Sequence, residues 1–386
     1  MANNNDNKVL NVPPLRFPEF SGEWKMCTIG ELITKVGSGV TPRGGEAVYK
    51  TEGHPFVRSQ NVGLGNLLLD DIAFIDEETH LRQKNTELQF NDVLLNITGA
   101  SIGRSALVDK QIVGGNVNQH VCIIRTKENL VPSFICSFLL SNYGQRQIDS
   151  FQAGGNRQGL NFDQIKSIKI TIPSKDEQIK IAKLLRAIDE RIATQNKIIE
   201  KLQSLIKGLR VCCMQRNGSN NVYLSEIAQI YQPQTISSAE LTEDGFLVYG
   251  ANGIIGKYKD YNHKTEQICI TCRGNTCGMV NYTKPMSWIT GNAMVINTDK
   301  YQDKVYKKYL YHYLSAYNFN SIISGSGQPQ IVRTPLEKLK ITLPTISEQK
   351  QKAMILDKVQ DKIEINHNIL NLYILQKQYL LRQMFI

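Results

Sequence analysis

The sequence lacks the features that mark membrane-spanning and secreted proteins. No apolar run approaches the ~18 to 20 residues that a membrane helix needs, and the polar start, MANNNDNKVL, has no secretory signal. The 8 cysteines are scattered through the chain, which favours reduced thiols over a disulfide framework. We therefore expect a cytoplasmic protein.

A metal site is not expected either. One candidate pattern is TCRGNTCG, in which four residues separate Cys272 from Cys277. A structural zinc site needs a second pair of cysteines or histidines at suitable spacing, and none follows in the sequence. We expect both residues to be buried or incidental thiols.

Signatures of catalysis are missing as well. The stretch ANGIIGKY has Ala251 in place of the first glycine of a phosphate-binding loop and Tyr258 in place of its hydroxyl residue. GLGNLL (63–68) lacks the third glycine of a dinucleotide fingerprint, and the Pro-Pro pair in VPPL has neither flank of a methyltransferase motif. The 6 histidines lie far apart with no HExxH pattern. These absences fit a binding protein.

The composition is that of a large, basic, folded protein. The 386 residues suffice for two or more domains, since single cores rarely grow past ~250 to 300 residues. Hydrophobic residues make up 41% and charged residues 21%, which is typical of globular chains. The net charge of +10 favours an anionic partner such as nucleic acid.

One segment of the chain occurs twice. IPSKDEQIKIAKLLRAIDERI and LPTISEQKQKAMILDKVQDKI are related by an offset of 171 positions, which aligns Pro173 with Pro344. The same offset places SFQAGGNRQGLNFDQIKSIKITIP over SIISGSGQPQIVRTPLEKLKITLP. Further back the offset drifts, as expected for loops of different length, but DVLL (92–95) still corresponds to QICI (267–270). The chain is therefore a tandem repeat.

Each half of the repeat has the same order of predicted elements. Short strand-like runs come first, separated by Gly, Asn and Asp turn residues, as in NDVLLNITG and EQICITCRG. One helix is expected in each half, near 132–147 and near 305–317. Each half closes with a long helix, at 177–214 and 348–385, that would span ~57 Å at 1.5 Å per residue. The sequence thus predicts a mixed domain followed by a long helix, twice.

The long helices carry an apolar stripe at alternating steps of four and three, which is typical of a coiled-coil seam. The predicted seam residues are Ile181, Leu185, Ile188, Ile192, Gln195, Ile199, Leu202, Ile206, Leu209, Leu356, Val359, Ile363, Asn366, Leu370, Tyr373 and Leu380. Lys352 and Lys377 interrupt the second stripe. Antiparallel pairing about the helix midpoints would bring the polar Gln195 and Asn366 together and fix the register. Two solvated amides at a kink are the alternative.

This layout resembles the specificity (S) subunit of type I restriction-modification systems. The resemblance rests on the repeated Pro…Glu-Gln signature before each long helix and on the opening LRFPEFSGEWKMCTIGEL (15–32). It implies an α+β fold in which two similar mixed α/β target-recognition domains are joined by two long antiparallel coiled-coil helices, as a pseudo-twofold repeat. The implied segments are a polar N-terminal tail at 1–14, target-recognition domains at 15–175 and 217–346, and spacer helices at 176–216 and 347–386.

The resemblance also implies a function. Members of this family read a split DNA sequence through the major groove, and their helices dock two modification (methyltransferase) subunits, which restriction (motor-nuclease) subunits join. The chain would be non-catalytic and bind no cofactor, with S-adenosylmethionine, ATP and Mg on the partner subunits. Because the two domains differ outside their shared frame, the target is expected to be asymmetric. A coiled-coil assembly or adaptor protein without DNA specificity is the alternative.

Polar residues on turns at corresponding positions are the expected DNA contacts, because Arg and Lys can pair with guanine, and Asn and Gln with adenine. In the first domain these are Arg43, Arg58, Gln60, Asn61, Arg104, Asn118, Gln119 and Arg157. In the second domain they are Asn252, Lys257, Lys259, Arg273, Asn275 and Gln328. A solvated or turn-closing role is the alternative for each.

The repeated Glu-Gln pair is interpreted as a junction between domain and helix. Glu177 and Glu348 would then be first-turn residues favoured by the helix dipole, not catalytic acids. Insertions or deletions after the two junctions should change the distance between the half-sites and leave their base sequences unchanged.

Overall fold

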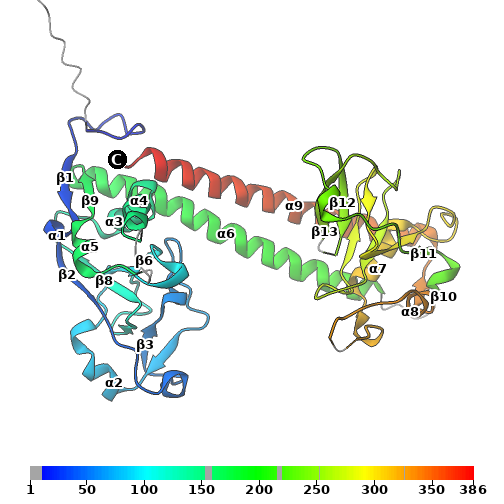
Figure 1. The fold of residues 1–386 in the computed structure, drawn as a ribbon, viewed down its shortest axis with the longest axis horizontal. Helices are drawn as coiled ribbons and strands as arrows, with labels where there is room; N and C mark the ends of the chain where they lie inside the picture. The colour runs from blue at the N-terminus through cyan, green and yellow to red at the C-terminus, as the bar shows by residue number, and fades with distance from the viewer. Residues whose placement is uncertain (1–10, 153–158, 215–219, 252, 326) are drawn as a thin grey trace, which may run out of the picture. The chain divides into compact units, whose positions relative to one another are not determined.

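The chain folds into two compact units (Figure 1). The computed structural model describes residues 11–152, 159–214, 220–251, 253–325 and 327–386. Unit 1 comprises Met1–Asn196 and Asn368–Ile386, and unit 2 comprises Lys197–His367. Each unit therefore contains one strand-rich domain and a part of both long helices.

Unit 1 begins with short strands and helices. Its strands are β1 (Lys25–Thr28), β2 (Ile33–Ser38), β3 (His54–Val57), β4 (Ala73–Ile75), β5 (Val93–Asn96), β6 (Ser105–Leu107), β7 (Asn116–Val117), β8 (Val121–Thr126) and β9 (Lys169–Ile172). Its short α-helices are α1 (Ile29–Leu32), α2 (Glu77–Arg82), α3 (Pro132–Leu140), α4 (Asn142–Ser150) and α5 (Phe162–Ser167). Its 3-10 turns are η1 (Gly45–Val48), η2 (Ser59–Asn61), η3 (Lys84–Thr86) and η4 (Gly99–Ser101).

The single helix predicted at 132–147 is wrong in extent. The chain forms α3 and α4 instead, because Ser141 between them has extended backbone angles (φ −72°, ψ 162°). The Ser141 hydroxyl accepts a hydrogen bond from the N–H of Gly144 at 3.2 Å, which caps the second helix.

In the residues that the structure describes, unit 2 repeats this order with fewer helices. Its strands are β10 (Asn220–Tyr223), β11 (Gln229–Tyr231), β12 (Phe246–Gly250), β13 (Gly253–Tyr258), β14 (Ile268–Thr271), β15 (Val280–Tyr282), β16 (Trp288–Ile289), β17 (Ala293–Asn297) and β18 (Lys340–Leu343). Its short helices and turns are η5 (Leu224–Glu226), η6 (Ser238–Glu240), α7 (Lys307–Ala316), η7 (Phe319–Ser321) and α8 (Arg333–Glu337).

The sheets of the two units have the same strand orders. Unit 1 has a four-stranded sheet β2-β8-β5-β6, a three-stranded sheet β4-β3-β7 and the pair β1-β9. Unit 2 has β11-β17-β14-β15, β13-β12-β16 and the pair β10-β18, which are the same arrangements strand for strand. The predicted runs DVLL and QICI form the corresponding strands β5 and β14, both fully buried. The predicted repeat of a mixed α/β domain is confirmed.

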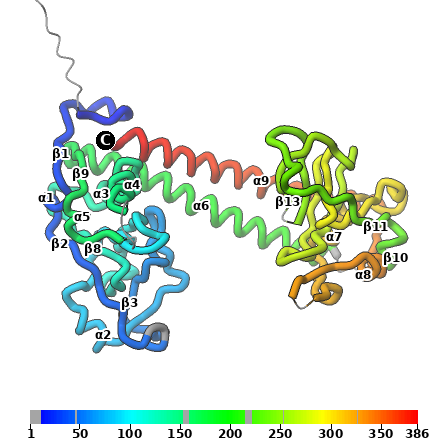
Figure 2. The backbone as a smooth tube through the Cα atoms, in the orientation of Figure 1, coloured from blue at the N-terminus to red at the C-terminus, as the bar shows by residue number. Residues whose placement is uncertain are grey.

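The long helices are α6 (Lys175–Met214) and α9 (Ile346–Gln383), each unbroken along its length (Figure 2). In unit 1 the end of α9 enters the domain core, where the rings of Phe385 and Phe134 lie 5.2 Å apart. In unit 2 the beginning of α9 packs on the end of α6, through Leu356, Ile363 and Ile206. The start of one helix thus meets the end of the other in each unit, which makes the pairing antiparallel. In the part of the chain that the structure describes, no helix combines the length and apolarity needed to cross a membrane.

The predicted seam residues all lie in buried or half-buried positions. The two lysines that interrupt the stripe are also held by specific partners. Lys352 Nζ donates to the carbonyl of Cys213 at 2.8 Å, and Lys377 Nζ lies 2.5 Å from the carboxylate of Asp189. Gln195 is buried, and the amide of Asn366 donates to the carbonyl of Lys362 at 2.6 Å. The predicted contact between Gln195 and Asn366 stays a prediction.

The start of α6 is tied to the beginning of the chain by a two-bond ion pair. Arg16 donates from Nε and Nη2 to the carboxylate of Glu177, at 2.7 Å and 2.8 Å. Glu177 is 1% exposed and lies in the first turn of the helix. Its role here is therefore structural, as is usual for a buried carboxylate with a fitted guanidinium partner.

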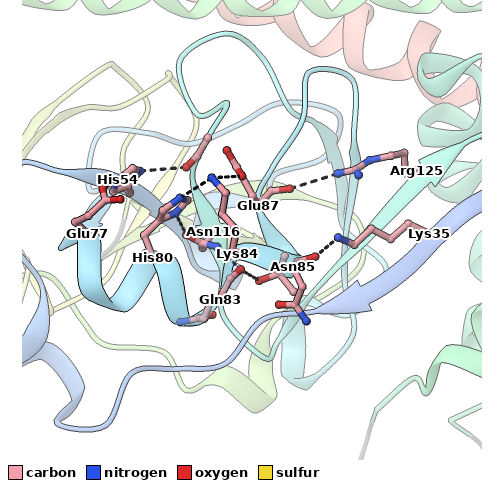
Figure 3. A network of polar contacts seen from close by, with 12 residues as sticks. Lys35, His54, Glu77, His80, Gln83, Lys84, Asn85, Glu87, Asn116 and Arg125 are labelled. Atoms are coloured by element: carbon pink, nitrogen blue, oxygen red, sulfur yellow. Dashed lines mark hydrogen bonds and ion pairs between the residues drawn. The ribbon is translucent and has the colours of Figure 1, made fainter.

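A polar network fastens α2 and η3 to the sheets of unit 1 (Figure 3). His54 on β3 contacts Glu77 on α2 at 2.6 Å, and the buried His80 contacts the amide of Asn116 on β7 at 2.7 Å. The Asn116 amide in turn donates to the carbonyl of Gln83 at 3.0 Å. The two imidazole rings stack with centroids 3.8 Å apart. This network fixes the position of β7, which leads directly into residues 118–120.

Candidate nucleic-acid interface

Three loop segments of unit 1 meet at the ends of β3, β5 and β7. We call this set loop cluster 1, and it comprises residues 58–61, 96–104 and 118–120. Backbone and amide hydrogen bonds hold the segments together: Asn96 Nδ2 to Ser59 O (2.8 Å), Asn118 N to Val57 O (3.0 Å) and Ile97 N to His120 O (3.0 Å). The segments thus form one connected surface.

Unit 2 has an equivalent set at the ends of β12, β14 and β16. Loop cluster 2 comprises residues 250–251, 271–279 and 290–292. The corresponding hydrogen bonds are Thr271 Oγ1 to Ala251 O (2.7 Å), Thr290 N to Tyr249 O (2.9 Å) and Cys272 N to Asn292 O (3.0 Å). Asn96 and Thr271 are the last residues of β5 and β14, so the same position makes the same bridge with different side chains.

A glycine turn is common to both loop clusters. Gly103 (φ +82°) donates to the carbonyl of Asn96 at 3.0 Å, and Gly278 (φ +91°) donates to the carbonyl of Thr271 at 2.9 Å. A positive φ of this kind strains any residue with a Cβ, and a Cβ on Gly103 would also lie 2.7 Å from the Gln145 side chain. The shape of the turn is therefore fixed by backbone geometry in both units.

The side chains that the two clusters expose are different. Cluster 1 exposes Gln60, Arg104 and Gln119, and cluster 2 exposes Arg273 and Asn275. At equivalent places in the shared turn, Arg104 corresponds to Met279, Arg273 to Thr98, and Asn275 to Ala100. Two surfaces with one backbone frame and different exposed groups can recognise different sequences.

Two further predicted residues join these clusters. Arg43 is exposed in the loop whose Thr41 donates from its backbone N–H to Gln119 Oε1 at 2.9 Å. Gln328 is exposed in a segment that pairs with cluster 2, where the N–H of Gly274 donates to the carbonyl of Pro329 at 3.0 Å.

Other predicted contact residues are not available to a ligand or lie elsewhere. Asn61 and Asn118 are 0% and 6% exposed and hydrogen-bond within their own turns, so both are withdrawn as contact residues. Lys257 pairs with Leu247, at the end of the β12–β13 hairpin away from cluster 2. Lys259 comes two residues later, beyond the same end of the hairpin, and is therefore also away from cluster 2. Arg157 and Asn252 lie outside the described residues.

Arg58 is half-buried and belongs to an internal network. Its Nη2 donates to the carbonyl of Asp71 at 2.6 Å, and its guanidinium lies 5.4 Å from the ring centroid of Tyr49. Sequence reasoning missed Asp71, because no local pattern marks a carboxylate that pairs across a loop. The sequence analysis also missed Thr271 and Thr276, whose hydroxyls both donate to the carbonyl of Ala251. These two residues align with Asn96 and Ser101 in the repeat, and that alignment could have identified them.

Loop cluster 2 contains the two cysteines of the TCRGNTCG pattern. Burial raises the pKa of both Cys272 and Cys277, which disfavours the thiolate form that binds a metal. Within the described ranges, no group of three His, Cys, Asp or Glu side chains is placed to hold a metal ion.

The sequence matches the model of a known protein family. The model for the type I restriction modification DNA specificity domain matches residues 21–204 and, a second time, residues 217–372. The chain belongs to this family. It carries the specificity domain twice, and each match covers one strand-rich domain with much of the long helix that follows it.

Specificity subunits of two organisms illustrate the likeness. The putative type I restriction enzyme MjaX specificity subunit of Methanocaldococcus jannaschii is 23% identical, over 93% of this chain and 92% of its own length. The type I restriction enzyme EcoprrI specificity subunit of Escherichia coli is 32% identical, over 35% of this chain and 34% of its own length.

A solved structure shares the whole fold. The crystal structure of the S subunit of a type I restriction-modification system from M. genitalium aligns with a TM-score of 0.66 and 17% sequence identity. The alignment covers 97% of this chain and 99% of that one. The two-domain architecture with long helices is therefore that of this specificity-subunit family.

Proposed function

We propose that this chain is the DNA-reading specificity subunit of a type I restriction-modification complex. The observation that carries the proposal is the pair of loop clusters, which have the same hydrogen-bonded frame and expose different polar side chains. A net charge of +10 adds a general attraction to the phosphate backbone. Each recognition domain then reads one part of a split target.

The target is asymmetric in this proposal. Base edges in the major groove are distinguished by the donors and acceptors that side chains offer. At the equivalent positions of the shared turn, cluster 1 offers Thr98 and Arg104 where cluster 2 offers Arg273 and Met279. Since the two surfaces differ in hydrogen-bonding groups, the two half-sites differ in sequence.

Modification subunits dock on the exposed apolar residues of the long helices. On the part of α9 in unit 1, Leu372, Leu375 and Tyr379 are 64%, 59% and 50% exposed, at the three-and-four spacing of one helix face. Leu375 and Tyr379 line a groove of ≈ 420 Å³ together with Asn142, Gln378 and Arg382. In unit 2, Met354 and Ile365 are 52% and 57% exposed. Exposed apolar patches of this kind are typical of protein-interaction surfaces.

The chemistry is supplied by partner subunits. Methyl transfer would take place on two modification subunits that bind S-adenosylmethionine. Cleavage would take place on restriction subunits that use ATP and Mg. This chain contributes the choice of sequence, and its family membership disfavours a coiled-coil adaptor without DNA specificity.

Mapping methylated adenines in the source genome, with and without this gene, tests the proposal. We expect methylation at one split, asymmetric sequence to disappear when the gene is removed and to return with a plasmid copy. An unchanged methylation map in a strain whose modification subunit is expressed would refute the proposal.

A further inference from the structure

Three predicted contact residues of unit 1 converge on one carboxylate. Arg58 Nη2 donates to the backbone carbonyl of Asp71 at 2.6 Å and lies 3.4 Å from Oδ2. Asn61 Nδ2 donates to Asp71 Oδ1 at 2.9 Å, and Gln60 Nε2 donates to Asp71 Oδ2. The Asp71 side chain is 57% exposed, so this network lies at the surface of loop cluster 1.

The orientation of Asn61 is fixed by the backbone. Its Oδ1 accepts from the N–H of Arg58 at 2.9 Å, and its Nδ2 donates to the carbonyl of Leu68 at 2.9 Å. A backbone N–H can only donate and a carbonyl can only accept, so the amide has one satisfactory orientation. Asn61 is also fully buried. It therefore always presents a donor to Asp71.

The orientation of Gln60 follows from that of Asp71. A carboxylate only accepts hydrogen bonds, so the amide atom that faces Asp71 Oδ2 must be Nε2. The carbonyl oxygen Oε1 of the exposed Gln60 is then the atom left to meet a ligand. In the major groove an acceptor pairs with the amino group of adenine or cytosine and is opposed by the O6 of guanine and the O4 of thymine.

The amide of Gln119 is oriented the other way from that of Gln60, because its oxygen is the atom bound within the protein. Its Oε1 accepts from the backbone N–H of Thr41 at 2.9 Å and from the Thr41 hydroxyl. Its Nε2 lies 3.2 Å from His120 Nε2. The backbone N–H of Thr41 therefore directs the Nε2 donor of Gln119 away from Thr41, whereas the Asp71 carboxylate directs the Oε1 acceptor of Gln60 away from Asp71.

We propose that Asp71 is a positioning residue that sets the base preference of the first recognition domain, by fixing Gln60 as an acceptor for an adenine or a cytosine. The proposal rests on the proposed function, since it names what one surface of that interface reads. Among the residues that the structure describes, this arrangement is found in the first recognition domain and has no counterpart in the second. Strand pairing aligns Ala73 with Phe56 and Gly256 with Val248, and Ile254 then stands where unit 1 has Asp71.

The variant Asp71→Asn replaces the acceptor that faces Gln60 with a donor. Asn61 continues to offer a donor, so the new residue turns its own oxygen toward Asn61 and its NH₂ group toward Gln60. The Gln60 amide must then rotate to accept from that group, which leaves Nε2 outward. The preference at this position should change from adenine or cytosine to guanine or thymine.

Selection from a pool of duplexes with randomised bases, using the full-length chain, measures this preference. We expect the wild-type chain to prefer adenine or cytosine about tenfold at one position of one half-site, within the usual cost of a mismatched base pair. Asp71→Asn should favour guanine or thymine at that position and change no other. Asp70→Asn, which removes the same charge from the exposed neighbouring residue, should keep the wild-type preference.

Gln60→Ala is the second variant, because an exposed side chain can be removed with little effect on folding. It should abolish the preference at the same position. The inference is overturned if the wild-type chain selects a split sequence and either variant leaves the preference at every position unchanged. A wild-type chain that selects no sequence at all overturns the proposed function instead, and the inference with it.

Discussion

Gln178 and Gln349 make the same set of hydrogen bonds at the start of the two long helices. Gln178 Oε1 accepts from the N–H of Val131 at 2.9 Å, and Gln349 Oε1 accepts from the N–H of Tyr306 at 2.7 Å. The other bonds are Gln178 Nε2 to Asn129 O (3.1 Å) and Pro173 O (3.1 Å), and Gln349 Nε2 to Lys304 O (3.1 Å) and Pro344 O (2.9 Å). The repeated glutamine fastens each helix start to the loop before α3 or α7.

Removing either glutamine should destabilise its own unit. Gln178→Leu leaves three backbone groups without their partner, and the group in the buried contact, the carbonyl of Pro173, costs roughly 1 to 3 kcal/mol when unmet. We expect a loss of at least that size in the free energy of unfolding, and the same for Gln349→Leu. Gln203→Leu, at an exposed position of α6, is the matched control and should cost less than about 0.5 kcal/mol. Urea denaturation of the three variants measures this, and equal losses in all three would contradict the assigned role.

Lys377 on α9 joins the helix pair to the recognition domain of unit 1. Its Nζ lies 2.5 Å from Asp189 on α6 and donates to the carbonyl of Leu64 at 2.9 Å. Burial raises the pKa of Asp189, and the charge of Lys377 opposes that rise. Without the lysine, a largely buried carboxylate would stand charged and unpaired at neutral pH.

Lys377→Met should therefore destabilise the protein more at pH 7.5 than at pH 5. The pKa of Asp189 is raised, so the energetic cost of its unpaired charge is present at pH 7.5 and decreases as falling pH protonates the carboxylate. We expect a loss of roughly 1 to 3 kcal/mol at pH 7.5, because Asp189 retains 32% side-chain exposure. Lys183→Met, at an exposed position of α6, serves as the control. A loss that is equal at the two pH values would argue against this account.

His312 makes unit 2 sensitive to acid. It is fully buried, Arg210 on α6 donates to its Nδ1 at 3.3 Å, and its Nε2 lies 3.0 Å from Asp357 on α9. Lys308, on the same helix as His312, pairs with Asp357 as well. Burial lowers the pKa of His312, and Arg210 and Lys308 lower it further, while Asp357 raises it. The contacts fit the neutral ring, since protonation would set an Nδ1–H against the Arg210 N–H.

Because the pKa of His312 is lowered in the folded state, the stability of the protein decreases as the pH is lowered. The unfolded chain binds the proton near pH ~6.5 and the folded chain only below that, so stability is lost as pH drops through about 6.5. His312→Gln should reduce the difference in unfolding free energy between pH 7.5 and pH 5.5. His367→Gln, at an exposed position, should leave that difference as in the wild type. An unchanged difference in the His312 variant would show that this residue is not the sensor.

Helix length should set the spacing of the two half-sites. Seven residues added to α6 after Asn196 and to α9 after His367 keep the heptad pattern and lengthen each helix by roughly 10 Å. At ~3.4 Å per base pair, the methylated target should gain about three base pairs between its half-sites. The bases of each half-site should stay the same. A lengthened chain that methylates the original target would disprove the link between helix and spacer.

The repeat and the long helices could be predicted from the sequence because both leave regular patterns. An offset of 171 positions relates the two junctions, and the three-and-four apolar spacing marks the helices. The resulting architecture agrees with the fold, down to the corresponding strands β5 and β14. The split of the predicted helix at Ser141 depended on one capping hydroxyl, which composition does not reveal.

The candidate site was predictable only in outline. The sequence identified turns with polar residues, but strand pairing decided that Lys257 lies at the end of its hairpin away from loop cluster 2. Asn61 was a candidate contact because of its residue type, yet the turn needs its amide to satisfy the backbone of Arg58 and Leu68. The pairing of Gln60 with Asp71 crosses a loop and follows no sequence period.

The central claim is that the two loop clusters read different parts of one split target. Base selection from randomised duplexes with the wild type, Arg104→Ala and Arg273→Ala tests it most directly, since both arginines are exposed at the shared turn. We predict two separated blocks of unlike sequence, with Arg104→Ala relaxing positions in one block and Arg273→Ala relaxing positions in the other, each by roughly 5-fold or more. A palindromic target, or variants that both relax the same block, would contradict the claim.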